Sequence, residues 1–327
     1  MGNERGDRFR RRWYRLWVSF FVGLLVLVSF MWKNSGEGVP EVRNLSSKPY
    51  RILREFLGPT CDFSDPFVSR FPTTDEINSK EGLQILEDLG QANRNHRKQW
   101  EFIAITRVLR KANMLVPGKR GLVFAAGTEP LISYFAAQGP HILATDMDYN
   151  NALEQGWVNT DQHVSNREGL FRKDLISRED FDERVSFAVA DMNHLNVSWF
   201  GTFDFIWTTC SVEHVGSIAL GQRFVRDSMN LLKPNGIAVH TTEFLLSSTE
   251  NTISEGGASF WRLKDFKAVL EGLKYDGHKP SSSICLKTGN DNPDEYDTHP
   301  YREHDHLRLE VGPYVITSVL WTAERGK

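Results

Sequence analysis

The chain has 327 residues, of which 40% are hydrophobic and 25% are charged, so it can form one large globular domain with attachments. The net charge of -3 gives no electrostatic case for binding nucleic acid, because the basic residues are scattered apart from one N-terminal cluster. Its three cysteines, Cys61, Cys210 and Cys285, are too few for a disulfide framework and lack the spacing of zinc ligands.

A basic tail, residues 1–15, precedes an uncharged run from Leu16 to Trp32 in which only Ser19 and Ser29 are polar. This run is near the lower limit of the roughly 17 to 25 residues that cross a bilayer, and it predicts one transmembrane anchor at 16–32. The arginines before the span place the N-terminus in the cytosol and the rest of the chain in the lumen. We expect a single-pass signal-anchor protein of the ER or Golgi, since a short span suits thin membranes. A cleaved signal peptide is the competing interpretation.

Residues 33–75 are expected to form a stem, because Asn34 to Pro59 is rich in Gly, Ser, Pro and charge. The apolar positions from Ile77 to Lys111 then fall near helical spacing. They predict two N-terminal helices within 76–114 that lean over the substrate side of a main domain at 115–327.

The stretch from Gly121 to Asp148 is the most informative part of the chain. It predicts an apolar strand (Gly121 to Ala126), a turn on Gly127, a helix (about Glu129 to Gln138) and a second strand that stops on Asp146. Such a turn lets a ligand approach the backbone, and an acid after the next strand can accept hydrogen bonds from ribose hydroxyls. Asp146 lies 19 residues after Gly127, near the expected offset of about 20. The turn lacks the three glycines of a dinucleotide site, which favours a ligand without a diphosphate.

The rest of the chain continues to alternate strands with helices. We expect helices at about Asn150 to Asn159 and Ala219 to Leu232, and strands at Arg184 to Ala190, Phe203 to Thr209 and Ile237 to Thr242. This alternation predicts a parallel sheet with helices on both faces. Residues 306–311 and 314–322 alternate around Gly312-Pro313, which predicts a C-terminal antiparallel hairpin. The predicted fold is α/β, with a Rossmann-like, seven-stranded, mostly parallel sheet preceded by the transmembrane helix.

From Leu115 to the C-terminus the chain resembles a class I S-adenosylmethionine-dependent methyltransferase of the type 11 kind. The matching elements are Gly127, Asp146, Asp191-Met192, Phe203-Asp204 through Ser211-Val212-Glu213-His214 on the fourth strand, and Leu231-Leu232-Lys233-Pro234-Asn235-Gly236 before the fifth strand. The resemblance implies S-adenosylmethionine as cofactor and the activity of a transferase of class EC 2.1.1.-.

The resemblance also implies a role for each matching residue. The first turn, Ala126 to Glu129 (Ala126, Gly127, Thr128 and Glu129), would wrap the methionine end of the cofactor. Asp146 would hold the ribose, and Asp191 with Met192 would contact the adenine. The chain departs from the family at Val123, where an acid is common, and at Ala125, where a glycine is usual. Glu129 either reaches the ammonium of the cofactor or occupies the first turn of the helix, where the helix dipole favours an acid.

Methyl transfer to a hydroxyl requires an aligned acceptor and a base. His214 follows the fourth strand, whose end faces the ligand, so His214 is the candidate catalytic base; its alternative is to bind a backbone carbonyl or cap the next helix. Glu213 would orient the His214 ring or bind a cation. No metal is assigned, because quinone O-methyltransferases carry an additional acid where this chain has Cys210.

Several other residues leave alternatives open. The segment from Asn290 to His306 holds His299, His304 and His306 among acids, and is a solvated loop, a substrate lid or a metal site. Three tryptophans stack on a sugar or pack in the core: Trp100, Trp157 and Trp261. A Cys61–Cys285 bridge requires an oxidising lumen, and Cys210 is expected to pack as a small apolar residue.

The sequence therefore predicts a membrane-anchored, lumenal O-methyltransferase with a small-molecule or glycan acceptor, of which the predicted location favours the glycan. Three rivals remain. A catalytically degenerate methyltransferase-fold scaffold is suggested by Val123 and Ala125, and a lipid or quinone acceptor by the anchor. A nicotinamide-dependent oxidoreductase is disfavoured by the missing glycines.

Overall fold

The computed structural model describes residues 52–327 apart from 60, 282, 293–294, 299–300 and 302–305. The predicted cytosolic tail (1–15), the predicted anchor (16–32) and the first part of the predicted stem (33–51) lie outside these residues. Within the described part, each helix is too short or too polar to cross a bilayer.

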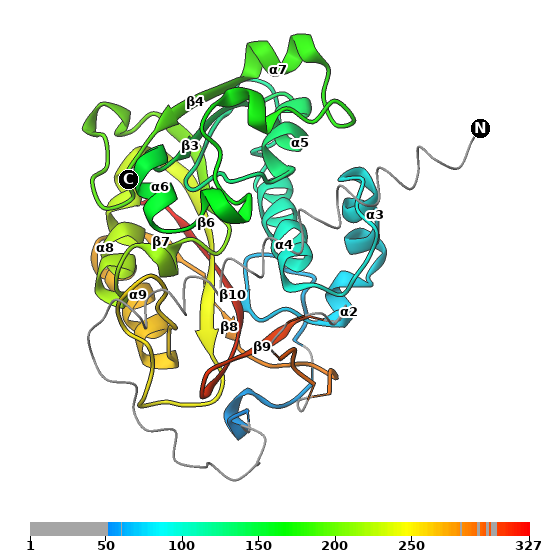
Figure 1. Ribbon diagram of the computed structural model, residues 1–327, viewed down its shortest axis with the longest axis vertical. Coiled ribbons are helices and arrows are strands. Elements are labelled where there is room, and N and C mark those ends of the chain that lie inside the picture. The colour runs from blue at the N-terminus through cyan, green and yellow to red at the C-terminus, as the bar shows by residue number, and fades with distance from the viewer. Residues whose placement is uncertain (1–51, 60, 282, 293–294, 299–300, 302–305) are drawn as a thin grey trace, which may run out of the picture.

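One sheet forms the centre of the fold, and its strand order is β4-β3-β2-β5-β6-β10-β1-β8, with β7 and β9 also paired to β10. The strands from β2 to β6 pair in parallel with one another, whereas β10 is antiparallel to β6 and β9 (Figure 1). The strands are β1 (Ser69–Arg70), β2 (Arg120–Val123), β3 (His141–Asp146), β4 (Val185–Val189), β5 (Phe203–Thr208), β6 (Leu232–Leu245), β7 (Lys279–Pro280), β8 (Ile284–Cys285), β9 (Arg308–Val311) and β10 (Tyr314–Glu324).

Helices cover both faces of this sheet. The α-helices are α2 (Thr74–Ile77), α3 (Lys80–Asp88), α4 (Arg97–Lys111), α5 (Leu131–Ala137), α6 (Tyr149–Glu154), α7 (Arg178–Arg184), α8 (Ile218–Ser228) and α9 (Leu263–Tyr275). The 3₁₀ turns are η1 (Arg54–Phe56), η2 (Val158–Thr160), η3 (Arg167–Leu170), η4 (Val197–Trp199), η5 (Val212–His214) and η6 (Met229–Leu231).

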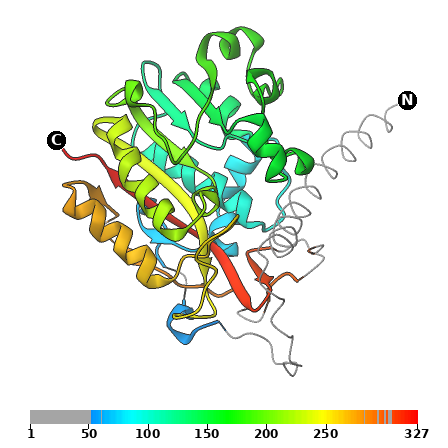
Figure 2. The same ribbon diagram turned by 60° about the vertical axis from the view of Figure 1, so that its left-hand side comes forward.

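Alternation along the strands separates two hydrophobic cores. Val123 and Trp207 pack in a core with residues of α4, α5 and α7, whereas Leu122 and Ile206 pack in a second core with residues of α8 and α9. Figure 2 shows α9 and the helices around α4 on opposite sides of the sheet. Because successive side chains of a strand point to opposite faces, continuous apolar strands need helices on both sides.

The predicted fold class is correct, but the described residues hold ten strands instead of seven. The three additional strands, β1, β7 and β8, have two residues each and lie on the far side of β10. Strands this short carry no alternating pattern that sequence reasoning could detect. The helices α7 and α9 were not expected either, and α2 precedes the two predicted N-terminal helices, α3 and α4.

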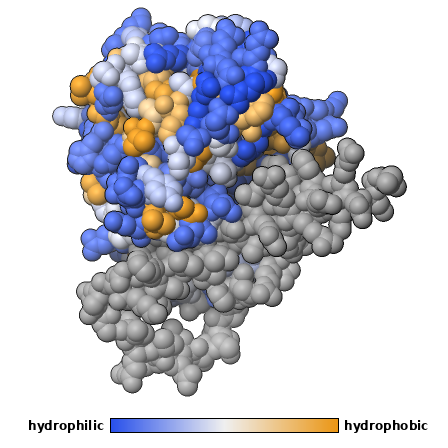
Figure 3. All heavy atoms as spheres, turned by 45° about the horizontal axis from the view of Figure 1, so that its top comes forward, coloured by the Kyte–Doolittle hydropathy of each residue, from blue (hydrophilic) through white to orange (hydrophobic). Residues whose placement is uncertain are grey.

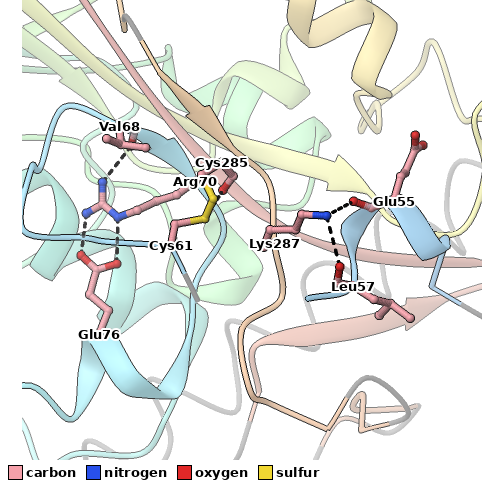
Figure 4. Close-up of a disulfide and its surroundings, with 8 residues drawn as sticks. All are labelled: Glu55, Leu57, Cys61, Val68, Arg70, Glu76, Cys285 and Lys287. Carbon is pink, nitrogen blue, oxygen red and sulfur yellow. Dashed lines mark hydrogen bonds and ion pairs between the residues drawn. A yellow bond between two sulfur atoms is a disulfide. The ribbon is translucent and has the colours of Figure 1, made fainter. Parts of the chain in front are cut away.

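The described end of the predicted stem, residues 52–75, packs on the folded body. Phe56 is buried in the core that contains α8 and α9, and the backbone amide of Leu53 donates a hydrogen bond to the Leu246 carbonyl over 2.9 Å. A disulfide joins Cys61 to Cys285 (Figure 4). Folding therefore begins by residue 52, because apolar side chains inside the Gly- and Pro-rich stretch find partners in the core.

Figure 3 shows the surface at the end of the molecule that carries α7. Its described residues are mostly hydrophilic, with apolar side chains in small separate patches. This is the ordinary surface of a globular protein.

Candidate active site

The candidate site lies where the sheet changes direction. The chain passes from β2 outward to β3 and β4, and then returns to add β5 and β6 on the other side of β2. In open α/β sheets, ligands bind outside the carboxyl ends of the strands at this switch point. Here the end of β2 leads into residues 124–130, which contain the first turn, and the end of β5 leads into residues 209–214.

Both segments hold a non-glycine residue in the left-handed backbone region. Ala125 has φ 51° and Cys210 has φ 47°. For residues with a Cβ this conformation costs about 1–2 kcal/mol, and such strain gathers at functional sites.

Gly127 permits a sharp turn and also leaves space for a neighbouring segment of the backbone. Its φ is +49°, and a Cβ added there would lie 2.8 Å from the carbonyl oxygen of Gln162. Thr128 also reaches this segment, since its hydroxyl donates to the Asp161 carbonyl over 3.3 Å. The sequence interpretation that Gly127 only leaves room for a ligand is therefore incomplete, because the backbone of residues 161–162 already approaches the turn.

Asp146 ends β3 with its carboxylate turned toward the first turn. Oδ2 accepts hydrogen bonds from the amides of Gly127 (2.9 Å) and Val164 (3.3 Å), and Oδ1 accepts one from Met147 (2.8 Å). Burial raises the pKa of Asp146, and the hydrogen bond from Gly127 partly opposes this rise. Since a carboxylate oxygen accepts about two hydrogen bonds, Oδ1 keeps capacity for one ribose hydroxyl.

Glu129 bridges the first turn and the end of β5. Its Oε2 accepts a hydrogen bond from the Thr209 hydroxyl over 2.8 Å. Burial raises the pKa of Glu129 to about 8, although the nearby Lys98 ammonium lowers it. Glu129 therefore lies inside the switch point, which favours the cofactor-ammonium interpretation over that of a surface helix residue.

Asp191 and Met192 follow β4, beside Asp146. The amide of Ala190 donates to the Asp146 carbonyl over 2.9 Å, and the exposed carboxylate of Asp191 accepts a hydrogen bond from His194 over 2.6 Å. Met192 is partly buried against the core that contains α8 and α9. The structure thus places this pair at the rim of the candidate site, next to the residue predicted to hold the ribose.

His214 lies in η5 with its two ring nitrogens in different surroundings. Nδ1–H donates to the Gly257 carbonyl over 2.6 Å, whereas Nε2 lies 3.9 Å from Oε1 of Glu213. Burial lowers the pKa of His214, so the neutral ring keeps a lone pair on Nε2. The alternative role predicted for His214, binding a backbone carbonyl, is therefore present, and the role of base stays a prediction.

Glu213 is fully buried beside His214. Its Oε2 accepts a hydrogen bond from Thr242 over 2.9 Å, and its Oε1 has no hydrogen-bond partner among the described residues. Burial raises the pKa of Glu213 to about 7. A carboxylate with one unused oxygen in such a place is a candidate to bind a cation or a polar ligand.

One loop contacts both halves of the site. Trp157 packs edge-on against His214 with ring centroids 4.7 Å apart, and Val164 of the same loop donates to Asp146. This loop therefore contacts both the predicted catalytic residue and the predicted ribose-binding residue. Trp100 and Trp261 are fully buried, so they pack in the core and do not stack on a ligand.

The N-terminus of α4 contributes charges that sequence reasoning missed. Nη2 of Arg97 lies 2.6 Å from Oε1 of Glu243 on β6, and Nζ of Lys98 lies 2.9 Å from Oε2 of Glu101. Lys98 also donates to the Thr209 carbonyl over 3.1 Å. The apolar spacing of α4 did not predict these contacts, because hydrophobic periodicity does not indicate which end of a helix is buried against a sheet.

Cys210 does not pack as the small apolar residue that was predicted. Its thiol donates to Oε1 of Glu101 over 3.0 Å and lies 3.4 Å from the Ser318 hydroxyl. Burial raises the pKa of this thiol. Cys210 therefore belongs to the polar cluster between α4 and the carboxyl ends of β5 and β6.

The segment before the C-terminal hairpin is only partly described, since His299 and His304 fall outside the described residues. His306 is buried, forms a short contact with Asp297, and stacks on His96 with ring centroids 4.7 Å apart. Of the alternatives predicted for this segment, the solvated loop is wrong at Asp297 and His306, which are both buried.

The chain matches no family model. It also matches no curated protein. Its backbone is similar to three solved structures among others. The [4+2]-cyclase SpnF shows 16% identity over 78% of this chain and 97% of that one, with a TM-score of 0.42. A 1,6-didemethyltoxoflavin-N1-methyltransferase of Burkholderia thailandensis shows 14% identity over 68% of this chain and 76% of that one, with a TM-score of 0.40. An S-adenosylmethionine-dependent methyltransferase of Clostridium acetobutylicum shows 12% identity over 75% of this chain and 98% of that one, with a TM-score of 0.40.

Proposed function

We propose that this chain is an S-adenosylmethionine-dependent methyltransferase. The observation that carries the proposal is a pair of carboxylates at the switch point of the sheet: Glu129 belongs to the first turn, and Asp146 at the end of β3 accepts a hydrogen bond from it. A sulfonium cofactor carries an ammonium at one end and a ribose diol in the middle, so it needs an acid for each. The first turn connects the two acids, as the sequence resemblance implies.

The cofactor would lie along the carboxyl ends of β2 and β3. Its ammonium would contact Glu129, the methionine part would follow residues 126–128, and one ribose hydroxyl would donate to Oδ1 of Asp146. Asp191 and Met192, next to Asp146 in space, would contact the adenine. The nearby oxygen Oε1 of Glu129 is the atom that would accept from the ammonium, since Oε2 already accepts from Thr209.

The transfer itself would use His214 as base. As the oxygen of an acceptor hydroxyl bonds to the methyl carbon, the carbon–sulfur bond breaks and leaves S-adenosylhomocysteine. Nε2 of His214 takes the hydroxyl proton, because Nδ1 is held as a donor by Gly257. Positioning and proton removal are the two contributions that this displacement needs from the protein.

A glycan or glycoconjugate in the secretory pathway is the proposed acceptor. The predicted anchor at 16–32 would place the folded part in the lumen of the ER or Golgi. The Cys61–Cys285 disulfide supports this location, since disulfides persist in oxidising compartments. Trp157, partly buried beside His214, is suited to stack on a sugar ring. A lipid or quinone acceptor is the alternative within the same activity.

The test is calorimetry with the full-length chain in mild detergent and S-adenosylhomocysteine as ligand. We expect 1:1 binding, and a thermal shift that grows with ligand concentration. Incubation with methyl-labelled cofactor and fractionated glycan, lipid and quinone pools then identifies the acceptor class. Absence of binding by the unmodified chain would refute the assignment.

One observation favours a second candidate, a methyltransferase-fold binding module without turnover. Asp146 already accepts three backbone amides, and residues 161–162 already approach Gly127. If the cofactor binds but no acceptor pool is labelled, this candidate replaces the enzyme.

A further inference from the structure

We infer that Cys210, Glu213 and Glu243 form a binding site for a divalent transition-metal ion, with zinc as the best match. Their donor atoms all lie within 4.8 Å of one another at the carboxyl ends of β5 and β6. This inference concerns metal binding and does not depend on methyl transfer.

Two buried carboxylate oxygens point to a missing ligand. Oε1 of Glu213 and Oε2 of Glu243 have no hydrogen-bond partner among the described residues, although Glu213 is 0% and Glu243 2% exposed. Leaving a buried acceptor unsatisfied costs about 1–3 kcal/mol, so each such oxygen calls for an explanation. A cation between them would satisfy both.

The charges of the surrounding side chains also leave room for a cation. The charged groups buried at this point are two cations, Arg97 and Lys98, and three carboxylates, Glu101, Glu213 and Glu243. With these ionised and Cys210 bound as its thiolate, the six groups carry a net charge of -2, the charge that one divalent ion neutralises. Buried charges are otherwise costly unless they are paired.

Each proposed ligand is oriented by a partner that a metal would leave in place. Arg97 holds Oε1 of Glu243, and Thr242 donates to Oε2 of Glu213, so the other oxygen of each carboxylate is left without a hydrogen-bond partner among the described residues. The backbone amide of Cys210 donates to the Thr241 hydroxyl over 2.9 Å. Such outer partners are the usual support of metal ligands.

The donor set selects the metal. Zinc binds thiolate at about 2.3 Å and carboxylate oxygen at about 2.0–2.2 Å, so the three donors need to close by about 1 Å. Binding releases the Cys210 thiol proton to solvent, so Glu101 no longer accepts a hydrogen bond from Cys210. The Glu101 carboxylate keeps its contacts with Ser318 and Lys98. A thiolate ligand disfavours magnesium and calcium. Three protein ligands leave a fourth position for water or an acceptor oxygen, a role that rests on the proposed function.

The experiment uses the full-length chain, stripped with a chelator and free of any affinity tag, and titrates it with Co²⁺ as a spectroscopic substitute for zinc. Cys210 is the one cysteine outside the disulfide. We expect a 1:1 thiolate-to-cobalt charge-transfer band that zinc displaces, which identifies Cys210 in the unmodified chain without any variant. Absence of this band in the unmodified chain would overturn the inference.

Variants separate the ligands. Cys210→Ser is expected to abolish the band, and Glu243→Gln to weaken zinc binding by more than the roughly 10–100-fold that loss of an outer partner costs. Glu310→Gln on β9, outside the cluster, is the matched control and should bind zinc normally. Unchanged zinc affinity in Glu243→Gln would count against the site. Cofactor binding, measured by calorimetry without metal, reports on the proposed function separately.

Discussion

The backbone amide of Gly127 donates a hydrogen bond to Oδ2 of Asp146 over 2.9 Å, and so ties the first turn to the end of the neighbouring strand. The same carboxylate holds Val164, so three segments meet on one side chain. Changes at either residue are therefore expected to affect both the stability of the turn and the binding of the cofactor.

Gly127→Ala is expected to destabilise the fold and weaken cofactor binding. The left-handed backbone costs about 1–2 kcal/mol for alanine, and the new Cβ would meet the Gln162 carbonyl at 2.8 Å. Melting temperature checks the first effect, at about 2–4 °C per kcal/mol. Gly277→Ala is the control, because Gly277 has φ +86° but no atom within 4 Å of the added Cβ. Equal melting temperatures of the two variants would contradict the role of Gln162.

Asp146→Asn is expected to weaken S-adenosylhomocysteine binding by roughly 10-fold or more, because a hydrogen bond to a charged group contributes about 1.5–3 kcal/mol. Calorimetry measures the change. Asp148→Asn is the matched control, since Asp148 caps α6 through its side chain and asparagine caps equally well. An equal loss of affinity in Asp148→Asn would move the ribose site away from Asp146.

Cofactor affinity is expected to rise with pH toward about 8. Burial raises the pKa of Glu129 to about 8, so well below this pH its carboxyl group is largely neutral and attracts the ammonium weakly. As the pH approaches 8 the carboxylate adds an electrostatic attraction, which is lost again at higher pH when the cofactor's α-ammonium deprotonates. Calorimetry from pH 6.5 to 8.5 checks the trend, and Glu129→Gln should flatten it. A pH dependence retained in Glu129→Gln would assign the titration to another group.

Arg97→Ala is expected to cost about 3–5 kcal/mol of stability in the metal-free chain, because it leaves the Glu243 carboxylate buried without its partner. Replacing both residues, as in Arg97→Met with Glu243→Leu, should recover most of this loss, since apolar side chains of similar volume carry no desolvation cost. Thermal unfolding of Arg97→Met, Glu243→Leu and the double variant forms the cycle. Additive losses would show that the two side chains do not interact.

The Cys61–Cys285 disulfide predicts a specific count of reactive thiols. Alkylation of the unreduced, denatured chain should modify one cysteine, Cys210, and alkylation after reduction should modify all three. Intact-mass measurement distinguishes the two results. Reduction should also lower the melting temperature, because the bridge closes a loop of 224 residues and such links contribute about 2–4 kcal/mol. Three modified thiols in the unreduced, secretory-expressed chain would exclude the bridge.

Much of the central sheet could be predicted from the sequence. The strand expected at Arg184 to Ala190 is β4 (Val185–Val189), and the one expected at Phe203 to Thr209 is β5 (Phe203–Thr208). The strand expected at Ile237 to Thr242 proved longer, since β6 begins at Leu232, which was expected to end the preceding helix. Pairing with β10 up to Leu245 extends it, and that pairing depends on a partner distant in sequence.

The candidate site could be predicted only in its local part. The spacing of Gly127 and Asp146 predicted that both belong to one ligand site, and the structure joins them by a hydrogen bond because adjacent parallel strands bring their ends together. The charged end of α4 could not be foreseen, because nothing near Arg97 in the sequence indicates a partner on β6.

The sequence by itself determined the order and type of the main elements, because hydrophobic periodicity is a property of neighbouring residues and survives without knowledge of the fold. Only the tertiary structure decided which charges meet. Arg97 and Cys210 are 113 positions apart in the sequence, and yet Nη1 of Arg97 lies 3.9 Å from Sγ of Cys210. Such contacts follow from how helices pack on the sheet. The energy of a buried charge depends on every group around it, so the local spacing of residues does not predict it.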